Sequence, residues 1–325
     1  MTTLAAEPTA ALAATGPTAA APDSAGTDHP PVVLAELHDA LTRRGMSLVE
    51  ITWEQQRLHE ARRWSVVEML DGIDVARLTP LERAMVWNAG RAELTTKPGA
   101  DRLERQADAE CGRWQRSNPT VAAIMQACGT WSRYWNEEEA HHETAFNRLA
   151  ALTGMEAIPD ETFLEFRQVF PDDGMLRTLV LLAISEITAA VNYGQCRAAA
   201  TDPGLRALFA QVAADEIQHR NYFLSFAKAL VDSGEYQAKD AFAVAHLFLR
   251  EDGELGGSAR ERVESRDTHV NWWDRLDTAD SAAAFQPEAS GRKEQLVCGA
   301  LQKITGLTVR TAAEVEDTWM DLVGA

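Results

Sequence analysis

The sequence predicts an all-α fold built around a bundle of four long helices. Strand-like alternation of polar and apolar residues is absent from about residue 32 onward, and glycine and proline gather at the joints between long periodic segments. Helices of about 30 residues reach about 45 Å, which is the scale of a long four-helix bundle. With 325 residues, of which 46% are hydrophobic, the chain can bury a large core without a disulfide framework.

Capping and turn residues set the expected boundaries of the four bundle helices. The first opens at Thr79-Pro80-Leu81-Glu82, a capping box with proline at the first helical position, and should kink or stop at Lys97-Pro98-Gly99. Asn118-Pro119 opens the second helix and Asp202-Pro203 opens the fourth. The helices after the first are expected at about 118–154, 173–200 and 202–234. The core bundle therefore spans about 80–232, and further helices are expected at about 33–69 and 239–323.

The first thirty residues differ in composition from the rest of the chain. They are nearly all Ala, Thr, Pro and Gly, and they lack both the features of a secretory signal and the arginines of a transit peptide. Residues 1–30 are therefore expected to be a disordered leader, because they hold too few large apolar groups to offset the entropy of ordering. Residues 31–325 are expected to form a single domain.

Charge and cysteine usage exclude several classes of protein. The 49 acidic side chains outnumber the 31 Lys and Arg, and a net charge of −18 disfavours nucleic-acid binding. The most apolar stretch, about 176–190, contains Ser185, Glu186 and Thr188, so no membrane span is predicted. The four cysteines lie far apart with no CxxC pair, which indicates a reduced, cytoplasmic protein.

Acidic side chains occupy core positions in all four predicted bundle helices. Two helices carry Glu-x-x-His, as Glu139/His142 and Glu216/His219, and residues three apart share one helix face. The third helix places Glu186, and the first places Glu93, where the helical period assigns a buried position. A buried carboxylate must be paired, protonated or bound to a metal. Four glutamates and two histidines on four helices match a carboxylate-bridged dinuclear site, and these ligands suit iron or manganese better than zinc.

The second helix offers two overlapping Glu-x-x-His pairs. Glu139/His142 continues the apolar seam that runs through Trp131 and Trp135. The other pair, Glu138/His141, faces about 100° away from that seam. His142 is therefore the expected ligand, and His141 is not.

Two segments resemble the soluble acyl-carrier-protein desaturases, a family of ferritin-like di-iron proteins. Residues 131–142 resemble the family's W-x-R-x-W-x-x-E-E-x-x-H segment, and residues 213–219 resemble its A-A-D-E-x-x-H segment. The resemblance covers about residues 80–232 and implies a ferritin-like four-helix bundle. It implies these metal ligands: Glu93, Glu139, His142, Glu186, Glu216 and His219. In the same way, Glu139 and Glu216 would bridge the metals, and Asp215 would fix the orientation of a ligand histidine.

The resemblance also implies an activity and its partners. It implies an O2-dependent oxidoreductase with two Fe ions (Fe2+/Fe3+) that desaturates an aliphatic acyl chain on a carrier protein. No flavin, NAD or cysteine-cluster motif is visible, so electrons would come from an external donor of the ferredoxin type. A homodimer is expected as well. An acidic carrier would need a local basic patch, for which Arg102/Arg105 and Arg260/Arg262/Arg266 are the candidates.

Departures from the family pattern leave alternatives open. Glu93 lies five residues before Pro98, which requires a one-residue shift from the family's spacing. Plant-type members carry Thr three residues after the third-helix glutamate, where this chain has Ala189, and the neighbouring Thr188 is the candidate for oxygen handling. Hydroxylation or another tailoring oxidation of a smaller substrate is therefore the second hypothesis. A non-enzymatic iron-binding bundle is the third.

Two further observations concern the substrate. The di-iron arylamine N-oxygenases usually have a third histidine at the position of Val212, so Val212 favours a desaturase. An acyl chain needs a long apolar slot beside the irons, and small or apolar residues of the third and fourth helices could line it. These are Ala183, Ala189, Ala190, Val212 and Ala213. Trp272-Trp273, in the segment after the bundle, indicates extra architecture that could shape a substrate site.

Overall fold

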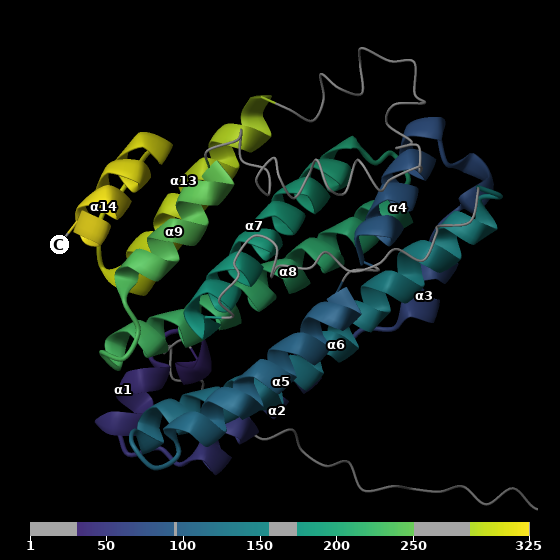
Figure 1. Ribbon diagram of the computed structural model, residues 1–325. Coiled ribbons are helices and arrows are strands. Elements are labelled where there is room, and N and C mark those ends of the chain that lie inside the picture. The colour runs from purple at the N-terminus through teal and green to yellow at the C-terminus, as the bar shows by residue number, and fades with distance from the viewer. Residues whose placement is uncertain (1–30, 94–95, 156–173, 250–286, 325) are drawn as a thin grey trace, which may run out of the picture. The chain divides into compact units, whose positions relative to one another are not determined.

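Helices make up all the regular secondary structure in the part of the chain that the structure describes. This part comprises residues 31–93, 96–155, 174–249 and 287–324 of a computed structural model (Figure 1). In chain order the elements are η1 (Val32–Leu34), α1 (Leu37–Thr42), α2 (Leu48–Arg62), α3 (Val66–Asp71), η2 (Val75–Arg77), α4 (Pro80–Glu93), α5 (Thr96–Trp114), α6 (Pro119–Leu152), α7 (Met175–Ala199), α8 (Pro203–Asp232), α9 (Ala238–Leu249), α13 (Pro287–Thr305) and α14 (Ala312–Gly324). The predicted all-α fold is confirmed.

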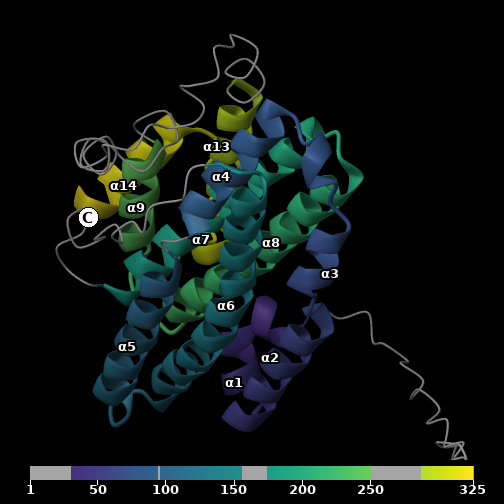
Figure 2. The same ribbon diagram turned by 90° about the vertical axis from the view of Figure 1, so that its right-hand side faces the viewer.

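Two pairs of neighbouring helices form the bundle. α7 packs along α8, and both α4 and α5 pack along α6 (Figures 1 and 2). α5 shares apolar contacts with the first half of α6 and α4 with its second half, so α4 and α5 together occupy the place of one long helix. The pairs meet where α6 contacts α8 and where α4 and α5 contact α7. The four-helix bundle expected at about 80–232 is therefore present, with its first helix in two parts.

The expected end of the first bundle helix falls inside α5. The sequence predicted a kink or stop at Lys97-Pro98-Gly99, but α4 ends at Glu93 and α5 begins at Thr96. Pro98 thus lies in the first turn of α5, where an amide proton would have no intrahelical acceptor and proline is tolerated. The proline is therefore a helix-start signal here. Glu93 is the last residue of α4 that the structure describes, because residues 94–95 lie outside the described residues.

The predicted capping box is formed and also ties two parts of the bundle together. The amide and the hydroxyl of Thr79 each donate to Oε2 of Glu82 at 2.8 Å, and the Glu82 amide donates to the Thr79 hydroxyl at 3.2 Å. Oε1 of Glu82 accepts from the amides of Thr201 and Asp202 at 2.7 and 2.9 Å. Burial opposes ionisation, but these hydrogen bonds lower the pKa of Glu82 to about 2. A single carboxylate therefore caps α4 and fixes the turn between α7 and α8.

Two apolar clusters fill the bundle on either side of the six predicted ligands. The first cluster contains α5 residues, the beginning of α6 as far as Trp135, and the end of α8 from Tyr222 onward. The second contains α4 residues, the end of α6 from Ala145 onward, and the beginning of α8 as far as Val212. On α6 and α8 the predicted ligands come between the two clusters. Their surroundings are therefore apolar in both directions along the bundle.

The other described helices pack around the bundle. The predicted helices at 33–69 correspond to η1 and α1 to α3, and those at 239–323 correspond to α9, α13 and α14. α2 and α3 contact α6, while α13 contacts α7, α8 and α9. The expected leader at 1–30 and the residues Arg260, Arg262, Arg266 and Trp272-Trp273 lie outside the described residues.

Among the described helices, α7 alone has the length and hydropathy that a membrane-crossing helix needs. Of its most apolar 18-residue window, 56% is buried inside the protein. α7 packs along α8 and contributes Glu186 to the interior of the bundle. These contacts are those of a core helix.

Candidate metal centre

The six predicted ligands converge in the middle of the bundle. All of them are buried, with exposed fractions of 6% or less. They form two groups that could each hold a metal ion, and within each group the ligand atoms lie within 4.8 Å of one another. One group is Glu93, Glu139, His142 and Glu216, and the other is Glu139, Glu186, Glu216 and His219. The four helices α4, α6, α7 and α8 thus bring together residues from positions 93 to 219 in a single cluster.

Two carboxylates, Glu139 and Glu216, belong to both groups. Oε2 of Glu139 lies 3.3 Å from Nδ1 of His142, and its Oε1 lies 2.9 Å from Nδ1 of His219. Oε1 of Glu216 lies 3.5 Å from Nδ1 of His142, and its Oε2 lies 3.3 Å from Nδ1 of His219. Each carboxylate therefore offers one oxygen to each histidine. This is the arrangement that a carboxylate bridging two metal positions requires.

The ring of His142 is arranged as a metal ligand would be. Its Nε2 lies 3.2 Å from Oδ2 of Asp215, and because a carboxylate only accepts, this nitrogen carries a proton. Its Nδ1 is buried and has no hydrogen-bond partner within the described residues. That nitrogen faces carboxylate oxygens of Glu139, Glu216 and, at 3.9 Å, Glu93. A buried nitrogen that faces three carboxylates without a hydrogen bond fits a cation bound among them.

The four carboxylates of the cluster fall into two pairs whose pKa values are shifted in opposite directions. Burial, together with the repulsion from Glu139 and Glu216, raises the pKa of Glu93 and of Glu186 well above the usual range. Burial also opposes ionisation of Glu139 and Glu216, but the two histidines outweigh it and lower both pKa values, that of Glu139 to about 2. The shared carboxylates are thus the anionic ones.

The two histidines balance these anions. Burial alone would lower their pKa values, but the neighbouring carboxylates raise both of them well above 6.5. Asp215 and Glu139 raise the pKa of His142, and Glu138 and Glu139 raise that of His219. Without a metal, these surroundings therefore favour the protonated forms of both imidazoles and of Glu93 and Glu186.

Metal binding should consequently release protons. Glu93, Glu186, His142 and His219 all have raised pKa values, and a metal ligand must give up its proton. Because protons compete with the metal for these groups, affinity should rise with pH, by up to about tenfold per pH unit for each proton released. Calorimetric titration with Fe2+ or Mn2+ in two buffers of different ionisation enthalpy measures this release. Heats that are identical in both buffers would contradict the prediction.

Asp215 lies next to the cluster, beside the ring of His142. Besides its contact with His142, it accepts hydrogen bonds from the Trp64 indole at 2.9 Å, from Gln211 at 3.1 Å and from Arg62. Arg62 is the last residue of α2, and Trp64 follows that helix closely. The hydrogen bonds fix Asp215, and so they fix the ring plane of His142.

The structure adds three residues that the sequence analysis did not select as site residues. Glu138, expected to face away from the seam, lies with Oε2 2.8 Å from Nε2 of His219, and its Oε1 lies 2.7 Å from Nδ1 of His59. Tyr193 donates a hydrogen bond from its hydroxyl to Oε1 of Glu93. Tyr193 lies seven residues after Glu186, so the helical repeat was a signal for it. For His59, which belongs to α2, the sequence carried no comparable signal.

Thr188 and His141 belong to neither of the two ligand groups. Thr188, the candidate for oxygen handling, donates its hydroxyl to the carbonyl of Ile184 at 3.0 Å, within its own helix. It follows Glu186 by two residues, which is about 200° around the helix, so it is not brought to the cluster. His141 is partly exposed and packs edge-on against Trp64, with ring centroids 5.6 Å apart. The expected difference between His141 and His142 thus has a structural basis.

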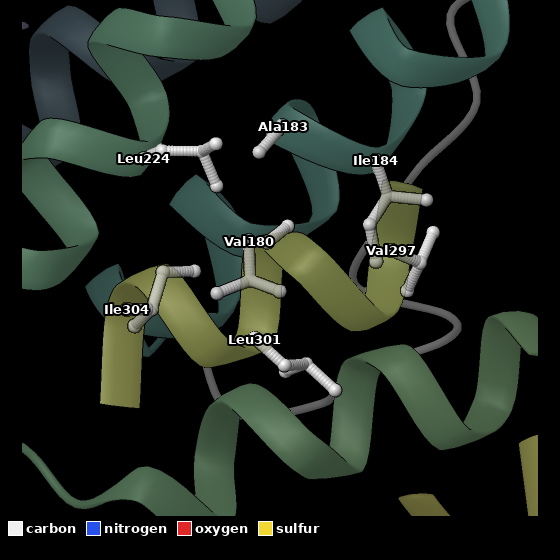
Figure 3. Close-up of a pocket in the computed structure, with 8 residues that line it drawn as sticks. Val180, Ala183, Ile184, Leu224, Val297, Leu301 and Ile304 are labelled. Atoms are coloured by element: carbon white, nitrogen blue, oxygen red, sulfur yellow. The ribbon is translucent and has the colours of Figure 1, made fainter. Parts of the chain in front are cut away.

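Four of the five residues proposed for a substrate slot divide between the two apolar clusters, and the fifth, Ala190, is partly exposed and belongs to neither. Ala183 belongs to the first cluster, whereas Val212 belongs to the second and Ala189 and Ala213 pack against it. Ala183 also lines an apolar pocket between α7, α8 and α13, to which Val180, Leu224, Val297 and Leu301 contribute (Figure 3). These side chains leave no space for a water molecule. The lining side chains therefore fill this pocket themselves in the conformation described.

Of the two candidate basic patches, only Arg102 and Arg105 fall within the described residues. Both lie on α5, and Arg105 is exposed.

Comparisons with known proteins yield one distant structural similarity. No protein-family model and no curated protein matches the chain. The chain is similar to an X-ray structure described as "putative acyl-ACP desaturase DesA2" from Mycobacterium tuberculosis H37Rv. The identity is 16%, the TM-score is 0.41, and the similarity covers 78% of this chain and 93% of that chain.

Proposed function

We propose that the chain is a di-iron, O2-dependent oxidoreductase. The observation that carries the proposal is the pair of ligand groups that share Glu139 and Glu216, with one histidine assigned to each group. Carboxylate oxygens with single imidazoles suit iron or manganese, whereas a structural zinc site would be tetrahedral and richer in Cys or His. When bound, the metal pair would supply the redox chemistry with O2 that oxidises an unactivated C–H bond.

The chain's own residues have three tasks in this proposal. Glu93 and Glu186 would each complete one metal position, and each would give up its proton when the metal binds. Asp215 and Glu138 would hold the two histidine rings through their outer nitrogens. The two apolar clusters would exclude water from the centre on both sides.

For the substrate, we propose an aliphatic acyl chain on an acyl carrier protein, which the chain would desaturate. The support is the resemblance of residues 131–142 and 213–219 to the desaturase segments, together with Val212 in place of the arylamine-oxygenase histidine. An external donor of the ferredoxin type, a homodimeric state and a cytoplasmic location belong to the same proposal.

A second candidate function is supported by residues 188 and 189. Thr188 bonds to its own helix backbone and Ala189 carries no hydroxyl, so the threonine of plant-type desaturases has no counterpart at the cluster. The alternative is hydroxylation or another tailoring oxidation of a small-molecule substrate by the same metal pair.

Product analysis distinguishes the candidates. The purified full chain is loaded with Fe2+ and incubated with acyl carriers of several lengths, a ferredoxin-type reducing system and O2, and the acyl products are examined by mass spectrometry. Loss of two hydrogens supports desaturation, and gain of one oxygen atom supports hydroxylation. If no acyl carrier is changed but a free small molecule is oxidised, the carrier hypothesis is wrong while the metal site stands. Iron uptake without any oxidised product would favour a non-enzymatic iron-binding bundle.

A further inference from the structure

The last turn of α2 reaches the metal centre from outside the four-helix bundle. His59, in this turn, is only 4% exposed. Its Nδ1 lies 2.7 Å from Oε1 of Glu138, and Oε2 of the same carboxylate lies 2.8 Å from Nε2 of His219. One carboxylate of α6 therefore joins a histidine of α2 to a ligand-type histidine of α8.

The ring of His59 is held in place by its other contacts. It stacks on Tyr134 with ring centroids 4.7 Å apart and an interplanar angle of 22°. The Tyr134 hydroxyl donates to Oε1 of Gln56, three residues before His59 on α2, at 2.7 Å. Nε2 of His59 faces Oε2 of Glu137 at 3.4 Å. A ring held on its face by Tyr134 can direct its Nδ1 proton at Glu138, while its buried Nε2 makes no hydrogen bond within the described residues.

This geometry determines what Glu138 can do for His219. A carboxylate only accepts hydrogen bonds, so the facing nitrogens Nδ1 of His59 and Nε2 of His219 both carry protons. With its proton on Nε2, His219 presents Nδ1 to Glu139 and Glu216, at 2.9 and 3.3 Å. A carboxylate on the outer nitrogen fixes the tautomer and the ring orientation of a metal-bound histidine.

The two ligand-type histidines have separate supports. His142 is held by Asp215, which is bound by Arg62, Trp64 and Gln211. His219 is held by Glu138, which is bound by His59. A change at His59 should therefore affect one metal position, and a change at Trp64 should affect the other.

We propose that His59 is a positioning residue for the metal position that contains His219, and that it acts by holding Glu138 against that ring. This inference rests on the proposed function, because it assumes that the cluster binds two metal ions. His59 does not contact the metal ligands themselves. It fixes the carboxylate that fixes one of them.

Two substitutions of His59 separate the hydrogen bond from the bulk of the ring. The amide nitrogen of asparagine can take the place of Nδ1, whereas that of glutamine takes the place of Nε2. His59→Asn should therefore keep the hydrogen bond to Glu138, and His59→Gln and His59→Ala should lose it. Glu60→Gln, at the exposed next position of α2, is the matched control.

The full chain and its variants are titrated with Co2+ without O2, and the two binding steps are followed by visible absorption. His59→Ala and His59→Gln should weaken one step about 10–100-fold, while His59→Asn and Glu60→Gln stay close to wild type. Trp64→Phe, which removes the indole donor to Asp215, should weaken the other step. Proton NMR of the Co2+-loaded chain provides a second readout, since each ligand histidine gives one shifted, exchangeable N–H signal. Only the His219 signal should exchange faster with solvent in His59→Gln.

Three results would overturn the inference. One is a set of unchanged binding steps and N–H exchange in both His59→Ala and His59→Gln. Another is equal weakening of both steps together with a lower melting temperature, which would show a structural role alone. If His59→Ala does not fold, the comparison of His59→Asn with His59→Gln decides. The third is wild-type chain that binds no Co2+, which would overturn the proposed function together with this inference. The first two results would overturn the inference only.

Discussion

Replacing Glu216 by alanine is expected to reduce the metal content of the chain from about two ions to less than one. Glu216 belongs to both ligand groups and offers one oxygen to each histidine, so its loss removes a ligand from both metal positions at once. The affinity should fall by more than the roughly 10–100-fold that loss of an outer partner costs. Glu139→Ala should act in the same way, because Glu139 is shared too. Metal analysis of the purified variants after loading with Fe2+ measures the effect.

The control for this experiment is Glu143→Ala, which removes a partly exposed carboxylate from α6 without touching either group. Circular dichroism should show that the Glu139 and Glu216 variants keep their helices. They should also lose some thermal stability, because two buried histidines then lack a carboxylate partner. The assignment of the bridging residues is wrong if folded Glu139→Ala and Glu216→Ala both retain two ions per chain.

The second large effect is expected at the adjacent histidines of α6. His142→Ala should lose most of the metal at its position, because His142 is fully buried with Nδ1 directed at Glu139 and Glu216. His141→Ala should leave the metal content nearly unchanged. His141 is partly exposed and packs against Trp64, and burial lowers its pKa below the usual range.

The two variants make a matched pair, since both remove an imidazole from one turn of one helix. Their metal contents, measured after identical loading with Fe2+, should differ by about one ion per chain. The register of α6 around the site would be wrong by one residue if His141→Ala lost the metal and His142→Ala kept it.

The sequence alone determined the helices and most of the cluster. Asn118-Pro119 and Asp202-Pro203 begin α6 and α8 as predicted, because a side-chain cap and a first-turn proline act locally. The period of 3.6 residues also identified Glu139 and Glu216 as buried. Each of these features depends on one helix at a time. Local sequence is therefore sufficient to predict them.

Tertiary structure decided what covers each helix face. Glu138 lies about 100° from the apolar seam of α6, so its position in the sequence predicts an exposed side chain. In the structure α2 packs there and places His59, 79 positions away in the chain, against Glu138. Tyr193 donates to Glu93 over a separation of 100 residues, and Pro98, which was expected to end a helix, lies within α5. Helical periodicity shows which face of a helix is buried, but not which neighbouring helix lies against it or at what height. For this reason the outer supports of the two histidines could be identified only once the packing of the helices was known.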